Sequence, residues 1–199
     1  LSNLLELYKS SSTTTEEKNE ILMLIEEEIN ELNQIVLEFL NFTKSEDHED
    51  VNVDVCQIIV EAVNILRGEM INRDVKIHTT FERDVMYANV DRRNFKQAMI
   101  NIIKNSVQAI NDSGHIFIDI KEADEKIRIV IRDTGIGIKD DEIKNIFEPF
   151  YTTKKDGTGL GLSTAYKTIR DNDGRLEVSS KYKEGTEFVI TIPNRRTSR

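Results

Sequence analysis

The sequence predicts an α+β protein that consists of a long helical hairpin followed by an α/β sandwich. Residues 16–44 contain no glycine or proline, and their apolar residues alternate spacings of three and four, which is typical of a heptad helix. After residue 54, segments that alternate like strands are separated by segments of helical periodicity. Strands in neighbouring pairs with helices between them favour a mixed sheet that helices cover on one face.

The long helix carries one continuous apolar seam, formed by Leu22, Ile25, Ile29, Leu32, Val36 and Phe39. Its outer faces carry the acidic residues Glu26, Glu27, Glu28 and Glu31. A seam this regular needs a partner helix, so we expect residues 1–46 to belong to a hairpin that forms a homodimeric four-helix bundle. The alternative is that this helix packs on its own domain.

The start of the long helix has a capping box, because Thr13 or Thr14 is followed three residues later by Glu16 or Glu17. The preceding KSSSTTT then reads as a turn. Residues 1 to about 9 therefore read as the end of a first helix, of which only part is present.

The second part, residues 52–195, follows SEDHEDVNV, which is predicted to be an acidic linker. Asp54 can cap a helix that runs to about Met70, and Asp91 can cap a helix over RRNFKQAMINIIKNSVQAIN. A further helix is expected from about Leu160 to Asp171. The predicted strands are VKIHTTF, with Val75, Ile77, Thr79 and Phe81 on one face, then HIFIDIKE, KIRIVIRD, RLEVSS and TEFVITI.

Composition excludes several classes of protein. A net charge of -9 argues against nucleic acid as the main partner, because phosphate binding requires a basic face. The single cysteine, Cys56, excludes an internal disulfide framework, and its apolar surroundings predict a packed thiol. No apolar run approaches the length of a membrane span, and no signal peptide is visible. The single cysteine also fits a reducing compartment, so a cytoplasmic location is expected. Because the chain begins at Leu1 and opens mid-helix in character, it reads as a fragment of a longer protein, and any membrane contact would lie in missing parts.

A glycine-rich segment, GTGLGLS at residues 157–163, directly precedes the last predicted helix. Gly157, Gly159 and Gly161 would let successive backbone N–H groups converge on phosphate oxygens. Neither the GxxxxGK[ST] pattern nor a GxGxxG after a first strand is present. On this feature alone, a flexible turn is an equal alternative.

Carboxylate and amide side chains add two further candidate groups. Asp133 ends a predicted strand before Thr134-Gly135-Ile136-Gly137-Ile138, where it could accept from an exocyclic amine such as that of adenine; the alternative is an ordinary Asp-Gly turn. Asn101 and Asn105 lie one helical turn apart and could supply a Mg²⁺ ligand and a hydrogen bond to phosphate. The alternative is two solvated polar residues.

The segment Thr152-Thr153-Lys154-Lys155 adds a fourth group, since a lysine near the glycine-rich loop could meet a terminal phosphate. As a bare charge pair it would be ordinary surface. In their order along the chain, an Asn-x3-Asn helix, a D-x-G-x-G, an F-x-P-F/Y-x-T-K segment and a G-x-G-x-G resemble the catalytic ATP-binding domain of bacterial sensor histidine kinases. They match its N box, its G1 box, its F box over FEPFYTTK and its G2 box, and Gly185-Thr186-Glu187-Phe188 matches its last turn.

The resemblance covers about residues 52–193, and the hairpin resembles the second helix of the family's dimerisation and phosphotransfer domain. It implies a Bergerat-type fold that binds ATP and Mg²⁺, with Asp133 at adenine, Asn105 on Mg²⁺ and Asn101 nearby. Residues 139–158 would form a lid over ATP. The other expected ATP contacts are Gly135, Gly137, Ile138, Thr153, Lys154, Gly157, Thr158, Gly159, Leu160, Gly161, Leu162 and Thr186. The FEPFYTTK form most resembles the nitrogen-regulation and sporulation-kinase branch.

Two departures bear on the chemistry. Gln108 stands where many relatives carry a Lys or Arg that contacts phosphate, which puts that contact in doubt. Related ATPases on this fold place a Glu where Asn101 stands, and an asparagine cannot act as a general base. Transfer to another nucleophile is therefore favoured over hydrolysis, with Asn101 and Lys154 as the catalytic candidates within the chain.

The family's nucleophile is a histidine in an HExxN/RP-type motif, which none of His48, His78 and His115 matches. We therefore expect the acceptor upstream of Leu1, and a phosphate that then passes to an aspartate of a response regulator receiver domain. The alternatives are an ATPase or chaperone-type switch, an anti-sigma serine kinase, and a dimerisation module with a degenerate nucleotide site.

Overall fold

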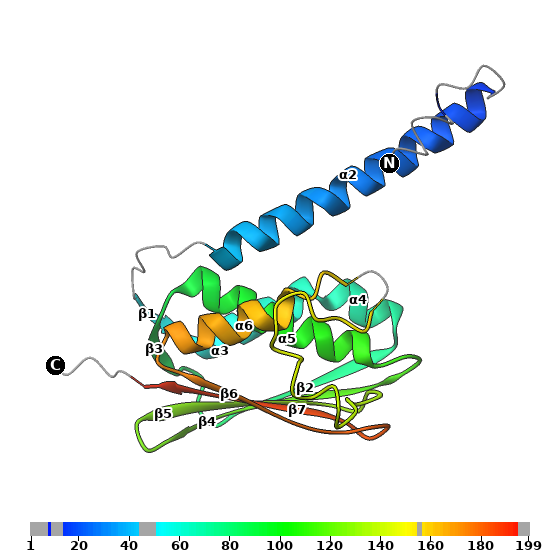
Figure 1. The fold of residues 1–199 in the computed structure, drawn as a ribbon. Helices are drawn as coiled ribbons and strands as arrows, with labels where there is room; N and C mark the ends of the chain where they lie inside the picture. The colour runs from blue at the N-terminus through cyan, green and yellow to red at the C-terminus, as the bar shows by residue number, and fades with distance from the viewer. Residues whose placement is uncertain (1–7, 9–13, 44–50, 155–156, 195–199) are drawn as a thin grey trace. The chain divides into compact units, whose positions relative to one another are not determined.

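The computed structural model describes residue 8 and residues 14–43, 51–154 and 157–194 (Figure 1). The chain divides into two compact units, Leu1–Lys44 and Ser45–Arg199. The first unit contains α2 (Thr15–Thr43), and the predicted first helix lies outside the described residues except for Tyr8, which is helical.

The capping box at the start of α2 is confirmed, and its members are Thr14 and Glu17. The Glu17 carboxylate accepts hydrogen bonds from the Thr14 N–H at 2.7 Å and from the Thr14 hydroxyl at 2.9 Å. The Glu17 N–H donates back to the Thr14 hydroxyl at 3.3 Å. These bonds to the Thr14 backbone and hydroxyl hold the pKa of Glu17 below its usual value, so the charged form is favoured at the helix start.

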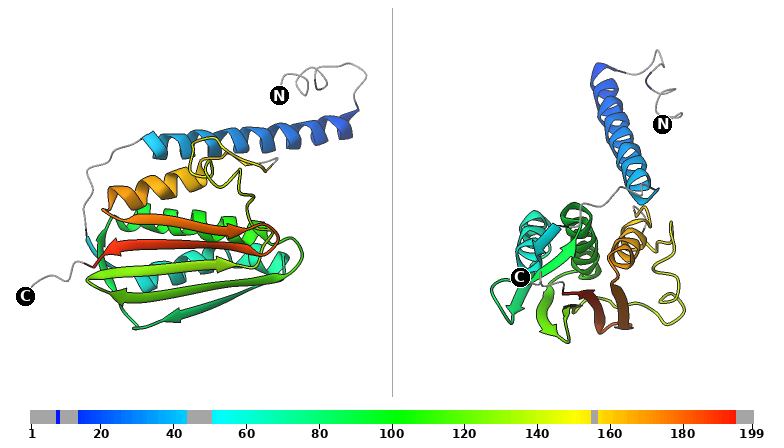
Figure 2. Two further views of the ribbon diagram at one scale, coloured as in Figure 1. Left: turned by 60° about the horizontal axis from the view of Figure 1, so that its bottom comes forward. Right: turned by 90° about the vertical axis from the view of Figure 1, so that its left-hand side faces the viewer.

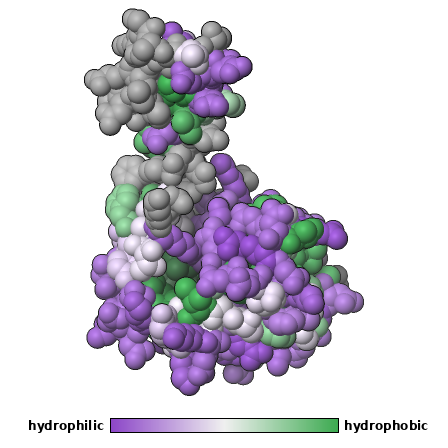
Figure 3. All heavy atoms as spheres, turned by 90° about the vertical axis from the view of Figure 1, so that its right-hand side faces the viewer, coloured by the Kyte–Doolittle hydropathy of each residue, from purple (hydrophilic) through white to green (hydrophobic). Residues whose placement is uncertain are grey.

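The apolar seam of α2 is largely uncovered in the single chain. Ile25 is buried, whereas the side chains of Leu22, Ile29, Leu32 and Val36 are 41 to 54% exposed. Among the described helices, none is both long and apolar enough to cross a membrane. The side of the molecule in Figure 3 is mostly hydrophilic, with apolar residues in small groups, which agrees with the charged fraction of 32%.

The second unit contains a five-stranded sheet in the order β2-β4-β5-β7-β6, in which β2 runs parallel to β4 and the other neighbours are antiparallel. A separate small sheet pairs β1 with β3. The strands are β1 (Val51–Asp54), β2 (Val75–Phe81), β3 (Tyr87–Val90), β4 (Gly114–Ala123), β5 (Lys126–Asp133), β6 (Arg175–Lys181) and β7 (Gly185–Pro193). The helices are α3 (Val55–Ile65), α4 (Arg67–Asn72), α5 (Arg92–Ala109) and α6 (Gly161–Asp171).

The helices of this unit cover one face of the sheet, as the sequence predicted (Figures 1 and 2). The inward positions of the central strands are fully buried isoleucines, which include Ile118, Ile129 and Ile190. They pack against the apolar stripe of α5, where Phe95 and Ile102 are fully buried. Alternation with a period of two thus places every second strand residue in the core.

Two predictions about the N-terminal end of this unit are wrong. VNV, predicted as linker, forms most of β1, where Val53 pairs with Ala88 of β3. The single helix predicted from Asp54 to Met70 is two helices that meet at the buried Leu66, whose backbone is not helical. Between β5 and α6, the described residues contain no helix or strand, as expected for the predicted lid.

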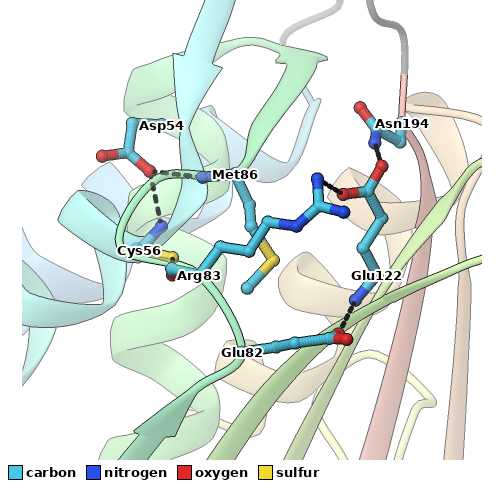
Figure 4. A network of polar contacts seen from close by, with 7 residues as sticks. All are labelled: Asp54, Cys56, Glu82, Arg83, Met86, Glu122 and Asn194. Carbon is cyan, nitrogen blue, oxygen red and sulfur yellow. Dashed lines mark hydrogen bonds and ion pairs between the residues drawn. The ribbon is translucent and has the colours of Figure 1, made fainter.

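Asp54 joins β1, α3 and the loop before β3 (Figure 4). Its Oδ1 accepts hydrogen bonds from the N–H groups of Cys56 at 3.1 Å and Met86 at 3.2 Å. The Cys56 thiol is buried and donates to the Arg83 carbonyl at 3.6 Å. Burial raises the pKa of Cys56 to about 11, so this thiol stays protonated, as expected for a packed cysteine.

The same network continues into the sheet through Glu122 of β4 (Figure 4). Its carboxylate pairs with the Arg83 guanidinium at 2.6 Å and accepts from the Asn194 side-chain amide just after β7. Its N–H donates to the Glu82 carboxylate at 2.9 Å. The end of the sheet that lies away from Asp133 is therefore tied to the small β1–β3 sheet.

We predict that Asp54→Ala lowers the free energy of unfolding by about 1–2 kcal/mol, because two part-buried backbone N–H groups lose their acceptor. Urea unfolding followed by circular dichroism measures this. Asp112→Ala, in the exposed turn after α5, is the matched control and should change stability by less than about 0.5 kcal/mol. Equal stability of the two variants would contradict the assignment of Asp54 as a cap.

Candidate functional site

α5 supplies three amide side chains to the site, Asn105, Asn101 and Gln108, and a fourth, Gln97, that contacts Asn101. Asn105 Nδ2 donates to the Asn101 carbonyl at 2.9 Å, which fixes the amide and leaves its Oδ1 available to other partners. Asn101 Nδ2 donates to the Gly161 carbonyl at 3.0 Å and so ties α5 to the first residue of α6. Gln97 donates to Asn101 Oδ1 at 3.0 Å, so both ends of the Asn101 amide are engaged. Gln108 is the third of these side chains.

Asp133 is the last residue of β5 and is only 3% exposed. Its Oδ1 accepts hydrogen bonds from the N–H groups of Gly135 at 2.9 Å and Thr186 at 3.2 Å. Burial raises the pKa of Asp133, and these bonds, with the nearby Ser106 hydroxyl, partly offset the shift. The Ser106 hydroxyl nevertheless makes no hydrogen bond of ordinary geometry among the described residues.

The DTGIG turn after Asp133 depends on a glycine with positive φ. Gly137 has a φ of 65°, and an added Cβ there would lie 2.2 Å from the Lys181 carbonyl oxygen at the end of β6. The next residue, Ile138, donates its N–H to the Ser180 hydroxyl at 2.8 Å. The turn is therefore held against the β6–β7 end of the sheet, beside Asp133.

The glycine-rich segment leads into α6 beside the two asparagines. Gly159 has a φ of 70°, and its carbonyl accepts from the Phe150 N–H at 3.0 Å. An added Cβ on Gly159 would lie 2.4 Å from the Phe150 carbonyl carbon, whereas one on Gly161 would have no neighbour closer than 3.7 Å. Leu160 is buried between them and anchors the loop.

Lys154 reaches α5 from the segment between β5 and α6. Its Nζ donates to Asn105 Oδ1 at 2.7 Å and to Gln108 Oε1 at 2.6 Å. Although the residue is exposed overall, burial of its ammonium against α5 lowers the pKa of Lys154 to about 8, and the charge of Lys104 lowers it further. A cation therefore already contacts the amide oxygen that was expected to bind Mg²⁺.

The remaining predicted residues lie at different places around Asp133, Asn105 and Lys154. Thr186 is buried beside Asp133, and its hydroxyl lies 3.0 Å from that of Ser180. The Thr158 hydroxyl accepts from the Leu160 N–H at 3.3 Å, Gly157 donates to the Lys154 carbonyl at 3.4 Å, and Leu162 packs against the core. Thr153 is exposed, and Lys155 lies outside the described residues.

Two serines at the site were not predicted from the sequence. The Ser180 hydroxyl links the DTGIG turn to the start of β7, because it accepts from the Ile138 N–H and donates to the Gly185 carbonyl at 2.9 Å. Ser106 is buried on the inner face of α5, beside the Asp133 carboxyl. The only sequence signal for a role of Ser106 is its position as a polar residue within the apolar stripe of the predicted helix.

A family model described as histidine kinase-, DNA gyrase B-, and HSP90-like ATPase matches residues 90–196. The chain belongs to this ATPase family. The region of the match includes Asn105, Asp133 and both glycine-rich segments, and the mixed sheet with helices on one face is the Bergerat-type fold.

Individual relatives of this ATPase domain are named histidine kinases. Sporulation kinase E of Bacillus subtilis (strain 168) is 34% identical over 176 residues, which are 88% of this chain and 24% of that protein. The solved catalytic domain of histidine kinase ThkA matches with a TM-score of 0.68 and 27% identity, over 73% of this chain and 96% of that one. Histidine kinase ThkA in complex with response regulator protein TrrA matches with a TM-score of 0.72 and 25% identity, over 100% of this chain and 57% of that one. The chain spans about a quarter of the length of the curated sporulation kinases that it matches.

The two glycines at the start of α6 should respond differently to alanine. We expect Gly159→Ala to lower the free energy of unfolding by about 1–3 kcal/mol, because the added methyl meets backbone at a positive φ. Gly161→Ala should stay within about 0.5 kcal/mol, since its methyl has room and its backbone is helical. Thermal or urea unfolding of the two variants checks this, and an equal loss in both would contradict the geometry of the loop.

Proposed function

We propose that this chain binds ATP with Mg²⁺ around Asp133 and Asn105 and is the catalytic part of a sensor histidine kinase. The observation that carries the proposal is the Asp133 carboxylate. Its Oδ1 is held by two backbone N–H groups, and the Ser106 hydroxyl beside the carboxyl also favours the charged form. A carboxylate has two acceptor oxygens, so with Oδ1 fixed by the backbone its Oδ2 is suited to an N–H group of a ligand.

Adenine suits this position because its exocyclic amine can donate to Asp133 Oδ2. Ile138 is half-buried and would supply an apolar wall for the ring, and Thr186 would keep the carboxylate in place through its N–H. Gly135 and Gly137 would leave room for the base beside the turn. A ring that lacks the amine would leave the carboxylate unpaired.

Asn105 fits a divalent cation of the magnesium kind. Its amide is oriented by the bond to the Asn101 carbonyl, and its Oδ1 already accepts from a cation, the Lys154 ammonium. Magnesium bound there would neutralise charge on the phosphates, and with one protein ligand it would take its other oxygen ligands from phosphate and water. Asn105 cannot hold both cations closely, so Lys154 would leave Asn105 and turn toward the phosphates.

The start of α6 would receive those phosphates. The N–H groups of residues 159–162 lie at a helix N-terminus, where the helix dipole favours anions. The Leu160 N–H would exchange its bond to the Thr158 hydroxyl for a phosphate oxygen. Asn101 links this helix start to α5 and so would keep the phosphate and metal positions in register. Further contacts with ATP would come from the lid residues Thr153, Gly157 and Thr158.

The phosphate would pass to a histidine outside the chain and then to an aspartate of a response regulator. Asn101 supports transfer over hydrolysis, because it cannot act as a general base and its amide is engaged at both ends. His78 and His115 lie within β2 and β4, which leaves them unsuited to the helical acceptor role. The relatives' names and the exposed seam of α2 support a kinase that dimerises through its hairpin. A cytoplasmic location is part of the proposal, and the free, buried Cys56 fits it.

Asp133→Asn should weaken ATP binding about 10- to 100-fold, because a charge-assisted hydrogen bond to the adenine amine is lost. Calorimetry with Mg²⁺ measures the affinity, and ITP, whose base lacks the amine, should bind the parent chain correspondingly worse than ATP. Asp112→Asn in the exposed turn after α5 is the control and should bind like the parent. Equal binding of ATP and ITP by the parent would refute the role of Asp133.

Lys154 should couple ATP binding to proton uptake above about pH 8. In the free chain its pKa is about 8, and nearby phosphates favour the charged form, so binding raises that pKa and takes up a proton. Affinity should therefore fall as pH rises from about 8 to 10, by at most tenfold per pH unit. Calorimetry in buffers of different ionisation heat detects the uptake, and Lys154→Met should bind more weakly with no such uptake. An uptake that persists in Lys154→Met would contradict the proposal.

A further inference from the structure

The second face of the five-stranded sheet is bare within the described part of this unit, because α3, α5 and α6 all lie on the other side (Figures 1 and 2). We call it the open face, and it consists of the outward residues of the five strands. Its cations are Lys76, Lys121, Lys126, Arg128, Arg132, Arg175 and Lys181, and its carboxylates are Asp119, Glu177 and Glu187. This face is therefore basic, although the whole chain carries a net charge of -9.

Most of these cations are not neutralised by neighbours. Arg175 pairs with Glu177 at 2.9 Å, and Lys181 pairs with Glu184 at 2.5 Å. Among the described residues, no carboxylate pairs with the remaining cations of the open face, which are Lys76, Lys121, Lys126, Arg128 and Arg132. Cations that form no ion pair are available to a partner of opposite charge, although Glu187 lies opposite Arg132 in the β5–β7 register.

A row of aromatic and cationic side chains crosses three strands of the open face. His78 of β2 stacks on Phe117 of β4, with ring centroids 5.0 Å apart and planes 15° apart. The Arg132 guanidinium of β5 lies 4.8 Å from the Phe117 ring centroid. His78 Nε2 is hydrogen-bonded to His115 Nδ1 at 3.0 Å. These contacts hold the side chains in place before any partner arrives, which lowers the entropy lost on binding.

Beside this row, Asp119, Lys121, Arg128 and Val130 line a shallow hollow of about 220 Å³ on the same face. In register, Asp119 lies opposite Val130, and Lys121 lies opposite Arg128. The hollow thus combines two cations with one carboxylate and one apolar wall. It could receive a short side chain from a partner that lies across the aromatic row.

The composition of the open face favours protein over the other anionic partners. Asp119, Glu177 and Glu187 interrupt the basic surface and would repel a continuous phosphate backbone. The apolar residues Phe117 and Val130 are only partly exposed within the sheet surface, so nothing protrudes to insert into a bilayer. Protein–protein interfaces are typically centred on aromatic and arginine side chains with polar residues around them, and Phe117 and Arg132 are placed in this way on the open face.

We propose that the open face is a docking surface for an acidic face of another protein. The partner's carboxylates contact Arg132, Lys121 and Arg128, and its apolar atoms pack on the Phe117 and His78 rings. Asp133 points to the opposite side of the sheet, so this surface is separate from the proposed nucleotide site.

The test uses this chain with amide chemical-shift mapping, and the probe is a 15-residue peptide of Glu, Asp, Leu and Tyr. We expect saturable shifts in β2, β4 and β5 and at least tenfold weaker binding by Arg132→Glu. Phe117→Leu should weaken binding at least threefold, which a purely electrostatic contact would not. Arg93→Glu, an exposed charge reversal on α5, is the matched control and should bind the peptide like the parent.

Unfolding curves that match the parent show that Arg132→Glu acts on the open face without changing the fold, so this test does not depend on the proposed kinase function. No saturable shift at millimolar peptide overturns the proposal, as does an equal loss in Arg93→Glu. Tighter binding of phosphatidylserine vesicles or single-stranded DNA through Arg132 would assign the face to a membrane or to nucleic acid and would also overturn it.

Discussion

A buried carboxylate at the end of the central strand β5 constrains the whole ligand-binding side of this domain. Asp133 stays in its buried position because two segments that are distant in sequence supply N–H groups to Oδ1, one from the DTGIG turn and one from the start of β7. That arrangement needs close backbone approach, which Gly185 provides at a φ of 123°, where an added Cβ would lie 2.1 Å from the Asp133 carbonyl oxygen. The glycines here therefore allow the backbone to approach closely enough for two N–H groups to reach one oxygen of the buried carboxylate.

The second half of the site depends on a single amide oxygen, Asn105 Oδ1. The bond from Asn105 to the Asn101 carbonyl fixes the amide, and the bond from Asn101 to Gly161 fixes the start of α6 relative to it. Lys154 fills this oxygen in the free chain, with Gln108 as its second acceptor. If Asn105 Oδ1 receives a metal ion as proposed, Lys154 must leave it, and the rearrangement would fall on the segment that carries Lys154 rather than on α5.

Much of this could be predicted from the sequence, because the relevant patterns repeat or occur in order. The heptad seam predicted α2, and alternating isoleucines predicted β4 and β5. β1 and β3 could not be predicted, because each has four residues and is defined by pairing with the other. The ordered motifs indicated Asp133 and Asn105, but a lone serine such as Ser180 gives no signal. The Lys154–Gln108 contact depends on the path of a segment without regular structure, which no periodicity describes.

The start of β4 is hydrogen-bonded to the residue that follows Asp133. His115 belongs to the aromatic row of the open face, and its backbone N–H donates to the Thr134 hydroxyl at 3.0 Å. Its carbonyl accepts from the Thr134 N–H at 3.1 Å, and Thr134 directly follows Asp133. Because both hydrogen bonds involve the same two residues, the start of β4 cannot shift without moving the turn that holds the buried carboxylate. A protein that displaced β4 from the open face would therefore act on the Asp133 side through Thr134, with no need for a path through the helices.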